Sequence, residues 1–139
     1  MILLPLAPMA CPRPRVFGNR AYMPDDYRRW KGDAVMMLRA LGRAWIGSRL
    51  PLRVSVAAVF ERPNRRPEGV DSDAWKSGSR VKRWAVPDAD NVFKAVADAL
   101  QDAGIVANDS DVEIGSVTRW YAAVGERAKV EISLEVADG

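Results

Sequence analysis

Three aspartates and one lysine in the middle of the chain have residue types and a spacing suited to metal-assisted chemistry. Asp88 and Asp90 follow a proline, and Lys94 comes one helical turn later. Asp109 lies further on, in a polar turn. Mg²⁺ prefers oxygen ligands and keeps several waters, so a few carboxylates from separate segments are enough to bind it. We therefore predict a Mg²⁺ site at Asp88, Asp90 and Asp109. Lys94 would stand beside it as a fixed positive charge.

The same residues also have an ordinary structural interpretation. Asp90 is suited to cap a helix N-terminus through its carboxylate. Lys94 could pair with Asp98, because side chains four residues apart meet on a helix. Asp109 and Asp111 are typical turn residues. Each residue alone fits this interpretation, and only their combination favours a site.

A helix must position these groups, and the pattern predicts one directly after Asp90. Apolar residues recur there every three or four positions, which is the period of one helical face. Gly104 follows where a helix commonly ends. If residues 88–90 are extended, Asp88 and Asp90 point to the same side. The predicted apolar face consists of Val92, Phe93, Val96, Ala99, Leu100 and Ala103.

This stretch resembles the RusA family of Holliday junction resolvases, which are crossover junction endodeoxyribonucleases. The matching residues are Asp88-Ala89-Asp90-Asn91, Lys94, Asp98-Ala99-Leu100, Gly104-Ile105-Val106 and Asn108-Asp109-Ser110. The resemblance extends toward the N-terminus through Tyr22-Met23-Pro24 and Tyr27-Arg28-Arg29-Trp30. One position departs from the family pattern. The family often has two consecutive acids at the turn, and here the first is Asn108.

The resemblance implies roles for these residues. The catalytic residues, of which the acids also bind the metal, would be Asp88, Asp90, Lys94 and Asp109. Asn91 and Asp98 would support the site, and we expect Asp98 to orient Lys94. The implied activity is Mg²⁺-dependent resolution of four-way DNA junctions by paired cuts in recombination and repair, with Mn²⁺ as an alternative ion. The implied partners are branched DNA and a second copy of the chain in a homodimer.

The composition narrows the chemistry independently. The 139 residues include no histidine and one cysteine, Cys11. A disulfide framework is therefore excluded, as are Ser-His-Asp catalysis and histidine-type zinc sites. Acid–base and metal chemistry must fall to Asp, Glu and Lys. A reducing cytoplasm fits the cysteine count, and no apolar run of about 18 residues predicts a membrane span.

Basic side chains are unevenly distributed, although the formal net charge is only +3. A loop is expected at residues 11–20. A flexible, basic connection is expected at about 61–79, where Trp75 would either cover the core or stack on an unpaired base. Lysine and arginine beside an acidic site would attract a DNA backbone. The predicted DNA-binding residues are Arg13, Arg15, Arg20, Arg62, Arg65, Arg66, Lys76, Arg80, Lys82 and Arg83.

The remaining periodicity predicts a single α+β domain over residues 1–139. A second helix should run from Pro24 to about Ile46. Both helices would pack on a mixed or antiparallel sheet of about five strands, as in the RusA-like fold. The expected strands are 2–6, 52–60, 82–86, 112–122 and 128–136. Two other functions stay open: a non-catalytic protein that binds branched DNA, and a metal-dependent nuclease that acts on flap or other branched DNA.

Overall fold

Five strands form one mixed sheet in the order β1-β7-β4-β6-β5, in a computed structural model that describes residues 1–137. Central β4 runs parallel to β6 and antiparallel to β7, and β1 and β5 form the edges. The predicted α+β fold with a mixed five-stranded sheet is confirmed. The strands are β1 (Ile2–Leu4), β4 (Leu52–Phe60), β5 (Val81–Lys82), β6 (Val112–Tyr121) and β7 (Lys129–Val136).

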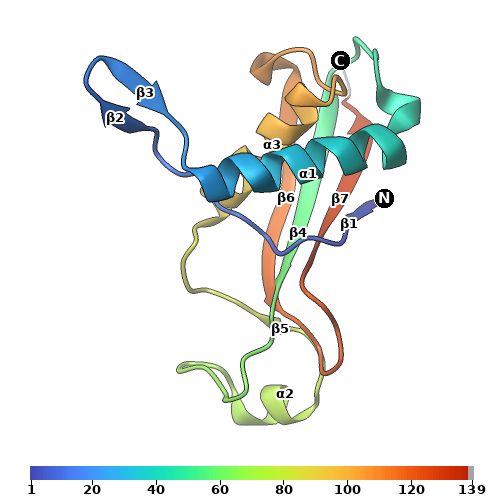
Figure 1. The fold of residues 1–139 in the computed structure, drawn as a ribbon. Helices are drawn as coiled ribbons and strands as arrows, with labels where there is room; N and C mark the ends of the chain where they lie inside the picture. The colour runs from blue at the N-terminus through green and yellow to red at the C-terminus, as the bar shows by residue number, and fades with distance from the viewer. Residues whose placement is uncertain (138–139) are drawn as a thin grey trace.

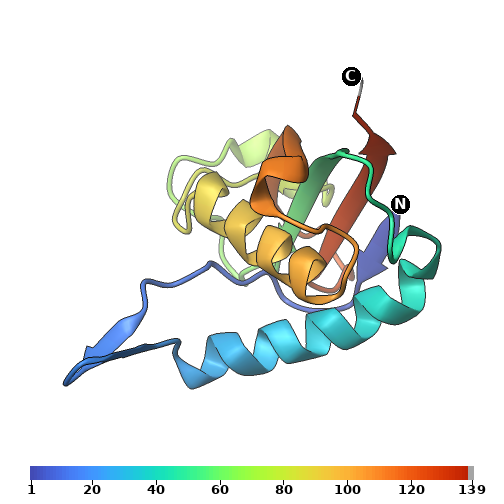
Figure 2. The ribbon, with the colours of Figure 1, turned by 90° about the horizontal axis from the view of Figure 1, so that it is seen from above.

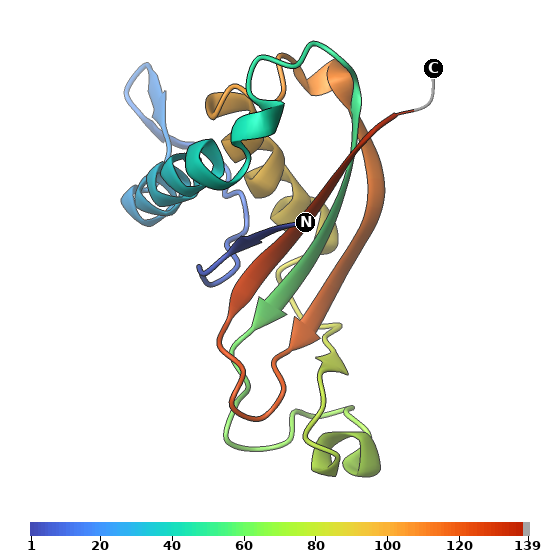
Figure 3. The ribbon, with the colours of Figure 1, turned by 90° about the vertical axis from the view of Figure 1, so that its right-hand side faces the viewer.

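The two main helices, α1 (Asp25–Leu41) and α3 (Ala89–Asp102), lie on the same face of the sheet (Figures 1 and 3). α3 belongs to the crossover between the parallel strands β4 and β6, which need a long connection. α1 ends at Leu41, earlier than the expected Ile46, and Gly42 directly after it packs tightly against Ile105. A Cβ atom at Gly42 would lie 2.8 Å from Ile105 Cδ1. Within residues 1–137, no helix combines the length and the hydrophobicity of a membrane-spanning segment.

The core lies between this helical layer and the sheet. Alternate residues of β4 point into it, and β7 contributes Val130 and Ile132. All six residues of the predicted apolar face of α3 are buried there, so that prediction is confirmed. From α1 the buried residues are Tyr27, Trp30, Ala34 and Leu38.

The start of α3 differs from the prediction. The helix begins at Ala89, so Asp88 occupies the N-cap position and Asp90 lies in the first turn. Residues 88–90 are therefore not an extended segment, and the Asp88 side chain makes no capping hydrogen bond. A sequence of two aspartates two residues apart allows either one to precede the helix, and in the structure it is Asp88.

The C-terminus of α3 turns the chain toward Asp109. Gly104 has a φ of 81°, a left-handed conformation that glycine adopts without steric cost. The amides of Gly104 and Ile105 donate to the carbonyls of Gln101 and Leu100, both at 3.0 Å. This double hydrogen bond is a Schellman motif, and it directs the chain to η2 (Asp109–Asp111) at the start of β6.

A hairpin occupies most of the segment expected to be a loop at residues 11–20. It consists of β2 (Arg15–Phe17) and β3 (Arg20–Tyr22), which pair around Gly18 and Asn19. Figure 2 shows the hairpin extending away from the rest of the molecule beyond the N-terminus of α1. All six strand residues are exposed. The hairpin is therefore a projecting arm.

The basic connection at 61–79 includes the short helix α2 (Ser72–Lys76) at the far end of the sheet (Figure 1). Trp75 packs there, with the Arg62 guanidinium 3.6 Å from its ring centroid and Tyr121 against its edge. Trp75 thus has partners within the protein, and the choice between covering the core and stacking on an unpaired base stays a prediction. The strand expected at 82–86 is shorter, because β5 ends at Lys82. The flexibility of this connection remains a prediction.

Candidate active site

Asp88 and Asp90 lie at the N-terminal end of α3. Both residues are exposed, and neither carboxylate makes a hydrogen bond or ion pair within residues 1–137. The positive end of the helix dipole favours negative charge at this position. Two carboxylates without hydrogen-bond or ion-pair partners in the described residues thus face solvent at the N-terminal end of α3.

Lys94 and Asp109 line a single cavity of about 260 Å³ between α3 and the start of β6. Lys94 lies one turn after Asp90 on the exposed side of α3, whereas Asp109 comes from η2. No carboxylate in the described part of the chain forms a salt bridge with Lys94. The ion pair between Lys94 and Asp98, which the structural interpretation of the sequence allowed, is therefore not formed. The structure thus brings Lys94 together with Asp109, the predicted acid that is furthest from it in the sequence.

Asp98 lines the same cavity, but its carboxylate is hydrogen-bonded to a residue of α1 and not to Lys94. Its carboxylate accepts a hydrogen bond of 2.8 Å from the Tyr27 hydroxyl, and the Cys11 thiol lies 3.8 Å away. Burial raises the pKa of Tyr27, and the hydrogen bond to Asp98 raises it further, so the phenol stays a donor. Asp98 thus ties α3 to α1. This geometry replaces the expected ion-pair contact with Lys94.

The described residues include no group of three or more acidic, cysteine or histidine side chains placed to hold a metal ion. Asp88, Asp90 and Asp109 are therefore not gathered around one point. The donor set nevertheless has the chemistry that Mg²⁺ prefers, because all three acids are exposed oxygen ligands.

The turn that leads into Asp88 is held by two arginines. Arg119 Nη1 on β6 donates to the carbonyls of Ala85 and Pro87, both at 2.9 Å. Arg83 Nη2 donates to the Val86 carbonyl at 2.6 Å. Sequence reasoning missed Arg119, because its two partners lie 34 and 32 residues away and leave no local signal. Arg119 therefore positions the segment that carries Asp88.

Three of the predicted DNA-binding arginines are engaged within the protein. Arg80 forms ion pairs with Glu126 and Glu131, and these contacts raise the pKa of Arg80. The Arg62 guanidinium stacks on Trp75, and the Arg83 guanidinium lies 4.0 Å from the centroid of the Phe60 ring. These contacts give the three arginines partners within the protein, and the phosphate contacts expected from the sequence stay a prediction.

The other predicted basic residues have fewer contacts within the protein, so more of their charge is available to a ligand. Arg13, Arg15 and Arg20 are exposed in the N-terminal arm and the segment before it. Arg65, Arg66 and Lys76 are exposed near α2, although Arg66 also donates to the Val70 carbonyl. Lys82 is partly covered, with its ammonium 4.1 Å from the centroid of the Trp120 ring.

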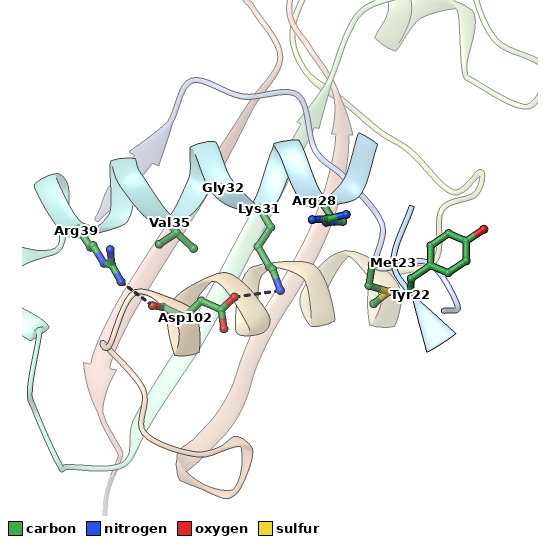
Figure 4. A pocket seen from close by; sticks show the side chains of 8 residues that line it. All are labelled: Tyr22, Met23, Arg28, Lys31, Gly32, Val35, Arg39 and Asp102. Atoms are coloured by element: carbon green, nitrogen blue, oxygen red, sulfur yellow. Dashed lines mark hydrogen bonds and ion pairs between the residues drawn. The ribbon is translucent and has the colours of Figure 1, made fainter. Parts of the chain in front are cut away.

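A second basic surface lies in the groove between α1 and α3 (Figure 4). This groove has a volume of about 680 Å³ and begins near Tyr22, where the hairpin ends. Lys31 Nζ lies 3.0 Å from the Asp102 carboxylate, and Arg39 Nη2 donates to the Asp102 carbonyl at 3.2 Å. Arg28 completes the basic wall. Neither Arg28 nor Arg39 was among the DNA-binding residues predicted from the sequence.

The family model for endodeoxyribonuclease RusA matches residues 5–135. No curated protein matches the chain. The family match begins just after β1 and covers both main helices, the strands from β4 to nearly the end of β7, and the whole segment from Asp88 to Asp109. The cavity shared by Lys94 and Asp109 thus lies within the matched region, and the chain belongs to the RusA family of endodeoxyribonucleases.

Proposed function

We propose that this chain is a structure-specific endonuclease that resolves four-way (Holliday) DNA junctions by paired phosphodiester cuts in recombination and repair. One observation carries the proposal within a family of endodeoxyribonucleases. Lys94 and Asp109 come from separate segments, line one cavity and have no ion-pair partners in the described chain. A lysine and an acid left free in this way are available to a phosphate and a metal ion.

In the proposed mechanism, Asp88, Asp90 and Asp109 would hold Mg²⁺. A bound Mg²⁺ supplies an activated water and neutralises charge on the reacting phosphate. The Lys94 ammonium stabilises the charge that develops on the phosphorane or on the leaving 3′-oxygen. The hydrogen bond from Tyr27 to Asp98 keeps α3 in place, so Lys94 stays at the cavity.

The proposed substrate calls for two such sites. A four-way junction must be cut in two strands of like polarity, and a two-fold symmetric homodimer offers two sites related in that way. The arm with Arg15 and Arg20, the basic residues near α2, and the groove between α1 and α3 would contact backbone phosphates. Such contacts orient DNA without reading its sequence. We place this activity in the cytoplasm, where DNA is accessible and Cys11 stays reduced.

A cleavage assay tests the proposal. Labelled four-way, flap and linear DNA of matched sequence are incubated with the protein in Mg²⁺, in Mn²⁺ and in a chelator. We expect paired, symmetric cuts in the four-way junction only when a metal is present. Faster cutting of flaps would favour the flap nuclease, and junction binding without cutting would favour the non-catalytic protein.

A further inference from the structure

Trp84 is the most unusual exposed side chain near the candidate active site. Its indole is 80% exposed, and Val86 on the same turn is 75% exposed. Two neighbouring exposed apolar side chains gain free energy when a ligand or partner covers them, which favours binding at this turn. Trp84 comes four residues before Asp88.

The turn that carries Trp84 is rigidly held. The main-chain carbonyls of Ala85, Val86 and Pro87 all accept hydrogen bonds from arginine side chains, as described above. In addition, the Arg83 amide donates to the Arg119 carbonyl at 2.9 Å, which joins the turn to β6. The main chain on both sides of Trp84 is therefore held against β6.

A pocket of about 270 Å³ opens beside this indole. Drug-sized ligands occupy pockets from about 300 Å³ upward, so this pocket suits a smaller group. Two aromatic rings form part of the wall, and small apolar side chains form most of the remainder. These lining residues are Val70, Ala74, Val81, Trp84, Ala85 and Tyr121.

The charges at the pocket argue against a phosphate as its occupant. Glu68 and Asp71 border the pocket, and their carboxylates would repel an anion. The Asp71 carboxylate already accepts from the Ala74 amide at 2.9 Å, whereas Lys82 is the single cationic residue in the wall. A flat, uncharged and aromatic ligand fits the apolar wall, the indole and the carboxylates together.

We propose that this pocket accepts an unstacked nucleobase of the DNA substrate, which stacks on Trp84. This inference rests on the proposed function. Trp84 comes four residues before Asp88, and four residues of chain reach at most ~14 Å, so the pocket lies on the side of the candidate site that carries Asp88. Taking a base out of the stack costs least where pairing is already disturbed, as at a branch point. The pocket would thereby select branched DNA over linear DNA.

Photo-crosslinking tests the contact directly. 5-Iodouracil is placed at each of the four positions on either side of the cut bond, and the complex is irradiated without metal so that the DNA stays intact. We expect one position to crosslink to Trp84 or Tyr121, as identified by mass spectrometry, and the crosslink to disappear in Trp84→Ala. Crosslinks that persist unchanged in Trp84→Ala would overturn the proposal.

Cleavage kinetics give a second readout. Base stacking on an aromatic side chain changes affinity by roughly 5- to 150-fold. Trp84→Ala should therefore lower kcat/KM on four-way junctions at least about fivefold, while Trp84→Phe keeps a stacking ring and stays within about threefold. Met36→Ala, which removes an exposed apolar side chain from α1, is the matched control and should leave kcat/KM unchanged.

The two proposals fail separately, because crosslinking needs no turnover. If the wild-type protein cuts no junction, the proposed function is wrong, and the crosslink still decides whether a base enters the pocket. Wild-type kcat/KM and cut positions in a folded Trp84→Ala variant would overturn the inference alone. So would a loss of self-association in Trp84→Ala with unchanged crosslinks, since the indole would then cover a second copy of the chain.

Discussion

At the scale of single residues, Lys94 carries the functional argument. Its ammonium is exposed, has no ion-pair partner within residues 1–137 and lies at a cavity shared with Asp109. A lysine that only stabilised α3 would be expected to pair with Asp98, but that carboxylate is occupied by Tyr27. Lys94 is thus available to a ligand at little cost to the fold.

We predict that Lys94→Ala separates activity from stability. Loss of a charge that stabilises the transition state should lower the cleavage rate at least about 100-fold. The free energy of unfolding should change by no more than about 0.5 kcal/mol, because the side chain is exposed and unpaired. Single-turnover cleavage and urea unfolding measure the two effects. Gln101→Ala, an exposed change on the same helix, is the control and should alter neither. A Lys94→Ala variant with the wild-type rate would remove Lys94 from the mechanism.

The sequence allowed prediction of site residues whose relations are local. Asp90 and Lys94 are separated by one helical turn, so their common side of α3 follows from the helical period. The contact between Asp98 and Tyr27 was not predictable, because 71 residues separate the partners and tertiary packing alone brings them together. For the same reason, sequence patterns could not predict which arginines would form contacts within the folded protein.

At the scale of elements, periodicity predicted those parts that have one buried face. α3 and β4 bury residues at the period of a helix and of a strand, and both were found where expected. The hairpin of β2 and β3 was missed because all of its strand residues are exposed, so no alternation marks it. The Gly18-Asn19 turn was its one local signal.

We predict that Arg119→Met loosens the turn before Asp88. Loss of the two hydrogen bonds to Ala85 and Pro87 should cost about 1.5–3 kcal/mol of stability. The cleavage rate should fall at least about tenfold, because misplacement near a reacting group is costly. The slope of log Kd for the junction against log salt should not change, since Arg119 faces the turn and contacts no phosphate. Arg127→Met, an exposed change between β6 and β7, is the control. A reduced salt slope in Arg119→Met would show instead that Arg119 binds DNA.

The connection between β6 and β7 predicts a pH dependence of stability. Hydrogen bonds from Arg80 lower the pKa of Glu126 from 4.5 to about 2. A carboxyl group with a lowered pKa in the folded state stabilises the fold above its unfolded pKa, and this contribution is lost as the pH falls through the folded pKa. The free energy of unfolding should therefore decrease between about pH 5 and pH 2.

The variant Glu126→Gln tests this dependence. It should lower the free energy of unfolding by about 3 kcal/mol at pH 7, and the difference from wild type should shrink toward pH 2. Urea unfolding at a series of pH values measures both curves. Glu135→Gln, which alters a more exposed acid paired with Arg53, should have a much smaller effect. Parallel curves for wild type and Glu126→Gln would contradict the prediction.

At the scale of the whole molecule, the arrangement separates a packed body from the surfaces that we propose to contact DNA. Both main helices cover one face of the sheet, the arm extends beyond α1, and α2 lies at the opposite end of the strands (Figure 1). Sequence patterns predicted the fold class, because the order of strands and helices limits the ways to build one core. They did not predict the direction of the arm, because its strand residues are all exposed and show no periodic apolar pattern.

We predict that the arm contributes to the salt dependence of junction binding. Each phosphate contact adds about 0.9 to the slope of log affinity against log salt. The double variant Arg15→Ala/Arg20→Ala should therefore lower the slope by about two. Fluorescence anisotropy across a salt series measures it. Arg43→Ala/Arg49→Ala removes two exposed charges near the other end of α1 and should leave the slope unchanged. An unchanged slope in the arm variant would place the arm outside the DNA interface.

Cleavage and binding by Asp109→Asn, measured on the same labelled four-way junction in Mg²⁺, test the central claim most directly. Asparagine keeps the size of the side chain and removes its charge. The account predicts a cleavage rate at least about 100-fold below wild type with junction affinity within about threefold, because a metal ligand and its charge are lost while the phosphate contacts remain. Cleavage near the wild-type rate by this variant would contradict the account.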